Sequence, residues 1–118
     1  MNELEKISQS LGLANIKKHI FICADQTKPK CCSKDESIKV WDYLNKRLSE
    51  LNLGETEVFF RTKANCLRVC KNGPIMVIYP EGIWYHSVDE RMIDKIIQDY
   101  IIGGKIVEAN LLCLNNSL

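Results

Sequence analysis

Two kinds of apolar pattern alternate along the chain: short uninterrupted runs, and longer segments with an apolar residue every three or four positions. The first run is His19–Cys23, whose apolar centre predicts an inner strand without a solvent-facing side. After a polar loop, residues 38–51 repeat at helical spacing, which predicts a helix with one buried stripe. Ser37 is expected to be its N-cap, and Asn52 and Gly54 to end it. The stripe consists of Trp41, Leu44, Leu48 and Leu51.

Three more apolar runs follow this helix. A short strand is expected over residues 57–61, and the order strand, helix, strand predicts a right-handed crossover between parallel strands. Residues 75–79 and 83–87 read as two further strands. Pro80 and Gly82 between them predict a type I turn, so these two strands should form a hairpin.

The last periodic segment predicts a helix from Asp89, as its N-cap, to about Ile102. Gly103 and Gly104 are expected to stop it. Four residues should line its buried face: Ile93, Ile96, Ile97 and Tyr100. The apolar residues beyond it, within 105–118, are expected to lie across the domain.

The element order is therefore β-α-β-β-β-α. This order predicts an α/β fold of the thioredoxin-like type, a four-stranded mixed sheet flanked by helices. Residues 1–18 are interpreted as an N-terminal extension with a short, poorly fixed amphipathic helix. Residues 19–107 form the domain, and residues 108–118 form a C-terminal tail.

Length and charge narrow the classes of function. A chain of 118 residues is one domain that can build a hydrophobic core without metal or disulfides. The formal net charge of +1 argues against a nucleic-acid binder. The longest apolar run is far shorter than the ~20 residues that a membrane span requires. The first residues lack the pattern of a signal peptide, so we expect a cytoplasmic protein.

Because the core does not need them, the cysteines are expected to have a role other than stabilising the fold. Cys23 ends the first apolar run, the pair Cys31–Cys32 follows it, and Cys66 and Cys70 lie four positions apart in a cation-rich segment. In a reducing compartment, clustered cysteines favour metal or redox chemistry over structural disulfides. We interpret four of these five sulfurs as the ligands of one iron–sulfur cluster.

Several alternatives compete with this interpretation. A structural zinc site would also use four thiolates, although such sites usually have tight C-x2-4-C spacing at both corners. Two disulfides, or a strained disulfide between Cys31 and Cys32, are the other covalent possibilities. A dithiol enzyme would need a C-x-x-C motif, which the chain lacks. His19 and His86 are weaker ligand candidates because the cysteines suffice.

The residues His19–Cys23, Cys32 with Ser37, and the run Cys66–Tyr85 together resemble the thioredoxin-like [2Fe-2S] ferredoxins. These electron carriers are related to the cluster-bearing small subunit of NADH:quinone oxidoreductases. The resemblance covers residues 19–107. It implies one [2Fe-2S] cluster near the surface, redox partner proteins and often a homodimer.

The resemblance also implies the ligand set. Three ligands fall on Cys23, Cys66 and Cys70, and the second falls on either Cys31 or Cys32. The interval to Ser37 favours Cys32, although the loop after Cys23 is shorter than is usual in the family. The sixth cysteine of the chain lies outside the matching region and is expected to be a small core residue; it is Cys113.

The leading functional hypothesis is a soluble one-electron carrier that is not an enzyme. A cluster-bearing subunit or redox sensor within a larger complex is the second hypothesis, and a zinc-stabilised interaction module is the third. Backbone N–H groups of residues 66–73 are expected to donate to the sulfurs, and a cis peptide bond is suggested for Gly73–Pro74. Four cations should favour the reduced cluster or meet an acidic partner: Arg61, Lys63, Arg68 and Lys71.

Overall fold

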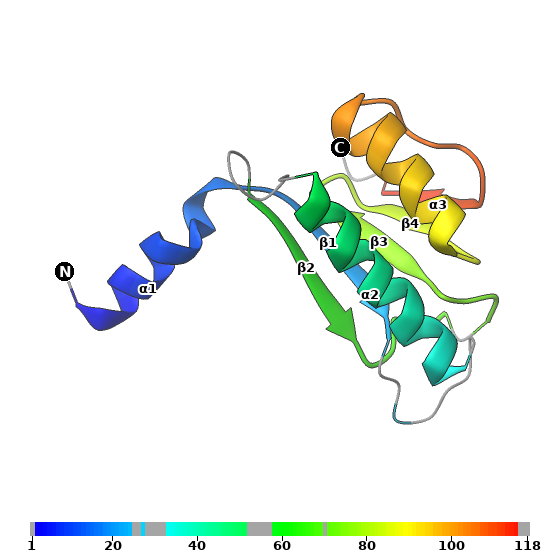
Figure 1. Cartoon of the computed structure of the whole chain (residues 1–118), viewed down its shortest axis with the longest axis horizontal. Coiled ribbons are helices and arrows are strands. Elements are labelled where there is room, and N and C mark those ends of the chain that lie inside the picture. Colours follow the sequence, from blue (N-terminus) through cyan, green and yellow to red (C-terminus); the bar gives the residue numbers. More distant parts are fainter. Residues whose placement is uncertain (1, 25–26, 28–32, 52–57, 70, 116–118) are drawn as a thin grey trace.

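The computed structural model describes residues 2–24, 27, 33–51, 58–69 and 71–115 (Figure 1). Its helices are α1 (Glu3–Leu11), the 3-10 helix η1 (Leu13–Asn15), α2 (Lys34–Glu50), α3 (Glu90–Lys95) and the π-helix η2 (Ile96–Ile102). Its strands are β1 (Ile16–Cys23), β2 (Val58–Ala64), β3 (Met76–Tyr79), β4 (Ile83–Tyr85) and β5 (Leu111–Leu114). No helix among these described residues is long and apolar enough to cross a membrane.

The strands form one mixed sheet in the order β2-β1-β3-β4-β5. β1 and β2 are parallel, and the pairs β1–β3, β3–β4 and β4–β5 are antiparallel. The predicted α/β fold, crossover and hairpin are confirmed. The predicted four-stranded sheet gains a fifth strand, β5, from the segment interpreted as a tail.

α2 begins at Lys34, four residues earlier in the chain than a helix starting after Ser37 would. Ser33 is its N-cap, and its hydroxyl accepts a hydrogen bond from the backbone N–H of Glu36 at 3.2 Å. The prediction of Ser37 as the cap is wrong, because Ser37 lies within the first turn and is fully buried. A small side chain there allows the helix to pack closely on the sheet. The buried stripe is Val40, Leu44 and Leu48, with Trp41 packed at its edge.

The helix beginning at Glu90 follows its prediction closely. The carboxylate of Asp89 accepts a hydrogen bond from the backbone N–H of Met92 at 2.8 Å, as an N-cap does. The helix continues as η2 up to Ile102, and Gly103 follows as its C-cap. All four residues predicted for its buried face are buried: Ile93, Ile96, Ile97 and Tyr100.

The turn between β3 and β4 differs from the predicted type I turn. The backbone N–H of Gly82 donates to the carbonyl of Ile78 at 2.8 Å, so the hydrogen-bonded turn spans five residues. The Tyr79–Pro80 peptide bond is cis, which the sequence analysis did not anticipate. The Gly73–Pro74 bond is also cis, as suggested.

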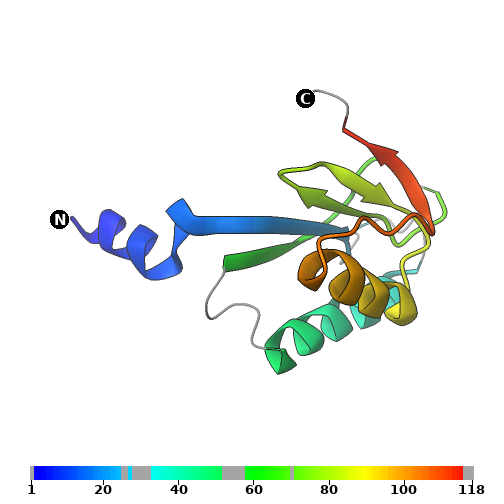
Figure 2. The ribbon, with the colours of Figure 1, turned by 90° about the horizontal axis from the view of Figure 1, so that it is seen from above.

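Both α2 and α3 cover the same face of the sheet (Figure 2). The core lies between them and includes the β1 residues Ile20 and Ile22. The opposite side, which we call the open face, has no helix over it among the described residues. The prediction that β1 has no solvent-facing side is therefore wrong. In the described strands, the open face carries the side chains that alternate with the core residues: Lys17, His19, Phe21, Phe60, Thr62, Val77, Tyr79, Trp84 and Cys113.

α1 stands away from the rest of the molecule (Figure 1). Its N-cap is Asn2, whose side chain accepts a hydrogen bond from the backbone N–H of Glu5 at 2.7 Å. None of its residues is buried. The expectation of a short amphipathic helix is confirmed, and Gly12 ends it in the left-handed conformation with φ at 69°.

β5 pairs with β4 at the edge of the sheet, so much of it is exposed. Leu114 is 49% exposed, and Cys113 is exposed rather than buried as predicted. An edge strand has a neighbour on one side alone, and none of the described helices lies over this part of the open face. Val107, in the segment before β5, is buried in the core. Its carbonyl accepts a hydrogen bond from the hydroxyl of Tyr85 at 2.8 Å.

A polar cluster closes the end of the sheet that is remote from the C-terminus of β1. The ammonium group of Lys18 donates to the carboxylate of Glu81 at 2.5 Å and to the hydroxyl of Tyr100 at 3.0 Å. The Tyr100 hydroxyl also donates to Glu81. Burial opposes the charge on Glu81, but these hydrogen bonds outweigh it and hold its pKa below the ordinary value. The cluster ties β1, the β3–β4 turn and η2 together.

Candidate metal centre

The candidate site begins where two parallel strands end. Cys23 is the last residue of β1 and lies opposite Ala64, the last residue of β2. Cys66 follows two positions later. Because neighbouring parallel strands run in the same direction, both cysteines leave the sheet at the same edge. The structure thus brings two of the four predicted ligands to one end of the molecule.

Cys23 is held firmly. Its side chain is buried, and its sulfur accepts a hydrogen bond from the backbone N–H of Ile75 at 3.0 Å. Its own backbone N–H donates to the carbonyl of Ile75 at 3.0 Å. Hydrogen bonds to sulfur stabilise a thiolate and lower the energy of added negative charge. The loop that precedes β3 therefore fixes and polarises this sulfur.

Cys66 occupies a different environment, because its side chain is exposed. Its sulfur accepts a hydrogen bond from the backbone N–H of Arg68 at 3.1 Å. Arg68 has a φ of 70°, a left-handed conformation that is uncommon outside glycine and that turns its N–H towards the preceding residues. The prediction that N–H groups of residues 66–73 donate to sulfur is confirmed at this position.

The two loops that leave β1 and β2 are joined by side-chain hydrogen bonds that the sequence analysis missed. The backbone N–H of Thr27 donates to the amide oxygen of Asn65 at 3.2 Å. The amide nitrogen of Asn65 in turn donates to the hydroxyl of Thr27 at 2.6 Å. An asparagine next to a cysteine in a polar loop carries no signal of this pairing, since its partner lies 38 residues away.

A third loop closes the site from the other side. The backbone N–H of Ser87 donates to the carbonyl of Asn72 at 2.7 Å, and that of Val88 donates to the carbonyl of Pro74 at 3.1 Å. Asn72 has a φ of 53°. These bonds attach residues 72–74 to the connection between β4 and α3. The segment that follows Cys66 is therefore anchored at its far end.

Three cysteines of the predicted set, Cys31, Cys32 and Cys70, lie outside the described residues. Within the described part of the chain, no group of three or more His, Cys, Asp or Glu side chains is placed to hold a metal ion. The assignment of Cys32 and Cys70 as ligands, and the choice of Cys32 over Cys31, remain predictions. Ser33, the N-cap of α2, follows Cys32 directly.

The four cations predicted to flank the site separate into two kinds. Arg61 points to α2, where its guanidinium donates to the side-chain oxygen of Asn45 at 2.5 Å. Lys63, Arg68 and Lys71 are exposed on the strand end and the loop that carry Cys66. Of the four, Arg61 is the one with a side-chain hydrogen bond to another element among the described residues.

Both histidines have neighbours other than cysteine. His19 lies on the open face, where its Nε2 is 2.8 Å from the hydroxyl of Thr62 and its ring stacks on Phe21 with 4.1 Å between centroids. Burial lowers the pKa of His19, which favours the neutral ring at physiological pH. The Nδ1 of His86 is 3.0 Å from the hydroxyl of Ser87.

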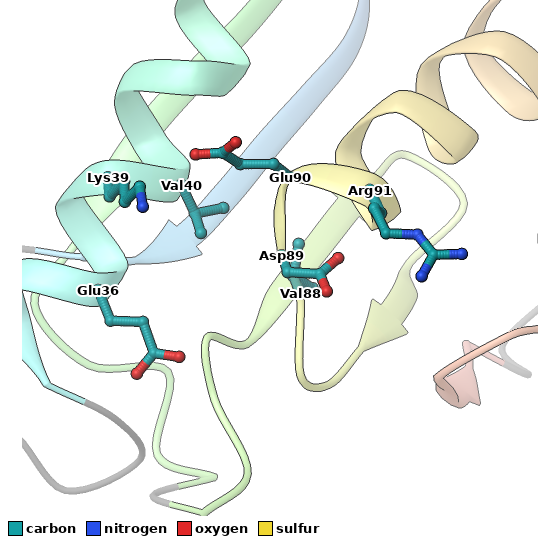
Figure 3. A pocket seen from close by; sticks show the side chains of 7 residues that line it. All are labelled: Glu36, Lys39, Val40, Val88, Asp89, Glu90 and Arg91. Atoms are coloured by element: carbon teal, nitrogen blue, oxygen red, sulfur yellow. The ribbon is translucent and has the colours of Figure 1, made fainter.

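A pocket of about 310 Å³ lies between the N-terminal parts of α2 and α3 (Figure 3). Its lining mixes carboxylates, cations and valines and includes no cysteine: Glu36, Lys39, Val40, Val88, Asp89, Glu90 and Arg91. Side chains of both charges project around it, so it offers no uniform field to a charged ligand.

The sheet order and the cysteines at the shared end of β1 and β2 define a thioredoxin-like α/β protein with a sulfur-rich site in place of a C-x-x-C motif. No family model matches the chain. However, it is 31% identical over 96 residues to "Ferredoxin, 2Fe-2S" of Aquifex aeolicus, an alignment that spans 77% of this chain and 85% of that protein. The chain belongs to the thioredoxin-like [2Fe-2S] ferredoxin family.

A second relative and the solved structures agree with this. "Ferredoxin, 2Fe-2S" of Clostridium pasteurianum is 30% identical over 101 residues, which spans 81% of this chain and 96% of that protein. The structure of a thioredoxin-like [2Fe-2S] ferredoxin from Aquifex aeolicus superposes with a TM-score of 0.70 at 27% identity, covering 86% of this chain and 94% of that one. A second structure of the wild-type protein from the same organism gives a TM-score of 0.67.

Proposed function

We propose that this chain is a one-electron carrier that binds a single [2Fe-2S] cluster through Cys23, Cys32, Cys66 and Cys70. When bound, such a cluster accepts and releases one electron at a potential set by its surroundings. The chain itself acts on no substrate; its residues hold the cluster, adjust its charge and present it to partner proteins.

The observation that carries this proposal is the pair of N–H···S hydrogen bonds at one edge of the sheet. Cys23 receives the N–H of Ile75 at 3.0 Å, and Cys66 receives the N–H of Arg68 at 3.1 Å. Each bond becomes stronger as negative charge accumulates on the sulfur. The donors therefore favour thiolate ligands in general and the reduced cluster in particular. This donor set fits an iron–sulfur centre.

The two sulfurs also differ in a way that suits electron transfer. The buried Cys23 would hold the inner side of the centre, and the exposed Cys66 would lie on the side facing a partner. Electron transfer requires close approach, so an exposed ligand loop is the natural contact point. Val69, which is 37% exposed in this loop, adds an apolar contact.

The cations around this loop indicate the chemistry of the redox partner. Residues 58–69 and 71–74 include Arg61, Lys63, Arg68 and Lys71 but no carboxylate. The cations that remain exposed would attract a partner with an acidic docking surface and would raise its association rate at low ionic strength.

Anaerobic isolation of the protein tests the proposal directly. We expect a coloured protein with two iron and two sulfide ions per chain, whose visible absorption bleaches on reduction and whose reduced form gives a one-electron EPR signal. A colourless protein that contains one zinc ion would identify a zinc-stabilised module instead. A stable complex with a larger enzyme in pull-down experiments would favour a cluster-bearing subunit.

Three further expectations accompany the proposal. Residues 19–107 would constitute the ferredoxin domain, with residues 1–18 as an extension and residues 108–118 as a tail. Two copies of the chain would associate as a homodimer. The protein would act in the cytoplasm, which cell fractionation can check.

A further inference from the structure

α1 exposes an apolar stripe that none of the described helices or strands covers. Leu4, Ile7 and Leu11 lie at positions i, i+3 and i+7, which is one side of a helix. They are 75%, 50% and 51% exposed. A nine-residue helix is marginal by itself in water, because most helix stability in proteins comes from packing of the apolar side. α1 therefore lacks the contact that would stabilise it.

The open face of the sheet has none of the described helices over it either. His19 contacts Phe60 edge to face with 5.8 Å between ring centroids, and Phe21 contacts Tyr79 in the same way at 6.2 Å. An antiparallel sheet that faces water usually carries polar side chains on that side. Here the rows across the sheet are largely aromatic, and Tyr79 remains 37% exposed. Such a surface marks an interaction site.

These two surfaces match in size. Nine residues of α-helix extend about 14 Å at 1.5 Å per residue. One row, Phe60–His19–Tyr79, crosses the sheet from β2 to β3. The next row, Thr62–Phe21–Val77–Trp84, crosses it from β2 to β4, which is three strand spacings or about 14 Å. α1 can thus cover the width of the open face when it lies across the strands.

The connection to β1 directs α1 away from its own sheet. Only Gly12 and the 3-10 helix η1 lie between α1 and Ile16, the first residue of β1. Both views show α1 extending beyond the end of the sheet rather than returning over it (Figures 1 and 2). The open face of a second copy can receive α1 without a reversal of this connection. In a two-fold symmetric dimer, each copy would give one helix and receive one.

Charge distinguishes a second copy from a membrane surface. α1 carries Glu3, Glu5 and Lys6, and its first turn is acidic. Interfacial helices that bind anionic membranes are rich in lysine and arginine instead. The described residues of the open face include no carboxylate, so α1 meets no like charge there.

We propose that α1 packs across the open face of a second copy of the chain, with Leu4, Ile7 and Leu11 against the aromatic rows that include Phe60 and Tyr79. This rests on the proposed association of two copies but not on electron transfer. The interface covers both the exposed stripe of α1 and the aromatic part of the open face. The edge of the sheet that carries Cys23 and Cys66 remains open to redox partners.

Sedimentation velocity of the full-length holoprotein over a range of concentrations tests the interface. Ile7→Glu places a charge in the centre of the stripe and should raise the dimer dissociation constant about a hundredfold, because the charge would be buried without a partner. Phe60→Thr on the receiving face should weaken the dimer in the same direction. Because α1 has no buried residue, Ile7→Glu should leave the circular dichroism and the cluster spectrum unchanged.

Gln9→Glu is the matched control. It adds the same charge to the opposite side of α1 and should leave the dissociation constant within about twofold. A photo-crosslinking residue at position 7, in a mixture of light and isotopically heavy chains, should join light to heavy chains at peptides from β1, β2 or β3.

Four results would overturn the proposal: a wild-type protein that is monomeric at all concentrations, a dimer that Ile7→Glu leaves intact, a dimer that Gln9→Glu weakens equally, or crosslinks confined within one chain. A dimer that persists in the Ile7→Glu variant would reject this interface but not dimerisation. None of these results bears on the iron content or EPR signal that tests the proposed electron carrier.

Discussion

Cys23 and Ile75 are joined by a reciprocal pair of backbone-mediated hydrogen bonds. The N–H of Cys23 donates to the carbonyl of Ile75, and the N–H of Ile75 donates to the sulfur of Cys23, both at 3.0 Å. Neither bond requires a metal. The end of β1 is therefore positioned by the sheet itself, and the fold prepares this ligand before any cluster is present.

For this reason, we expect the apoprotein to keep most of its helix and sheet. The core is built from apolar residues of the sheet, α2, α3 and η2, and the predicted ligands are not part of that packing, apart from the buried Cys23. Circular dichroism of the apo and holo forms should agree closely in the far ultraviolet. Amide exchange should accelerate on iron removal at Cys66 and Arg68, while Ile20 and Ile22 remain protected.

A collapse of the far-ultraviolet spectrum to coil on iron removal would contradict this expectation. It would place the protein with small zinc domains, whose metal-binding energy is their folding energy.

Replacement of the two neighbouring cysteines should separate their roles. We expect Cys32→Ser to lose or strongly destabilise the cluster and Cys31→Ser to leave its absorption spectrum nearly unchanged. The reason is the register of Cys32 to α2, whose N-cap is the next residue, Ser33. Iron and sulfide content with the visible spectrum of each variant checks this, and the opposite result would assign the ligand to Cys31.

Removal of a cation near Cys66 should lower the midpoint potential. Arg68→Gln removes an exposed charge two residues from that ligand and keeps the backbone N–H that donates to its sulfur. A unit charge about 8 Å away through water contributes about 0.5 kcal/mol, or roughly 20 mV for one electron. Potentiometry at low salt should show a decrease of this order that becomes smaller as salt is added.

Arg61→Gln is the matched control for this measurement. Its guanidinium is bound to Asn45 on α2 rather than exposed on the loop, so its removal should change the potential less than that of Arg68. Equal shifts in both variants would show that overall charge, and not the position of Arg68, sets the effect.

The bridge between Thr27 and Asn65 should slow the loss of the cluster. Asn65→Ala removes both of its side-chain hydrogen bonds to the loop that follows β1. Each bond contributes about 1 kcal/mol, or about 2 kcal/mol together, so we expect cluster release to a chelator to accelerate by up to roughly thirtyfold, with little change in the melting temperature of the apoprotein. An unchanged release rate would mean that the cysteines alone hold the two loops together.

Glu81→Gln should destabilise the protein in a pH-dependent way. The pKa of Glu81 lies below its ordinary value of 4.5, so its contribution is present above pH 4.5 and is lost as the pH falls through the folded-state pKa. The two side chains are partly exposed, which limits the loss at pH 7 to about 0.5–1 kcal/mol. Urea unfolding at pH 7 and below pH 4 should show a difference from wild type that shrinks in acid.

The stabilisation contributed by Lys18, the basic residue of the same cluster, depends on pH in the opposite direction. Burial opposes the charge of Lys18, but its hydrogen bonds outweigh this and raise its pKa above the ordinary value of 10.5. Its contribution to stability is therefore present below pH 10.5 and is lost at higher pH.

Glu108→Gln is the control for Glu81→Gln. It removes an exposed carboxylate elsewhere on the surface, and the variant should unfold like wild type at each pH.

The sequence predicted the elements whose signals are local. The helical stripe containing Leu44, the N-cap at Asp89 and the stop at Gly103 each depend on residues within a few positions, and each is confirmed. Ser37 was predicted as a cap because two acidic residues precede it. The actual cap is Ser33, and those acidic residues lie in the first turn of the helix, where carboxylates are equally favourable.

The missed features depend on contacts between distant parts of the chain. β5 is a short, exposed strand that exists because β4 offers it an edge, and apolar pattern could not distinguish this from a buried tail containing Cys113. The side chain of Arg61 donates a hydrogen bond to Asn45 of α2, which lies sixteen residues away in the chain. For the site, the sequence predicted Cys23 and Cys66 as ligands of one cluster, but it gave no sign of the hydrogen bonds from Asn65 that join their loops.

The placement of Lys18 and Cys23 at opposite ends of β1 has a consequence for engineering. Five residues of extended strand separate them by about 17 Å, which exceeds the Debye length of about 8 Å at physiological salt. A change in the protonation of the Lys18–Glu81–Tyr100 cluster therefore has little electrostatic effect on the edge that carries Cys23 and Cys66. Substitutions in the Lys18 cluster can therefore change the thermal stability of the protein without changing the redox potential at the other end of β1.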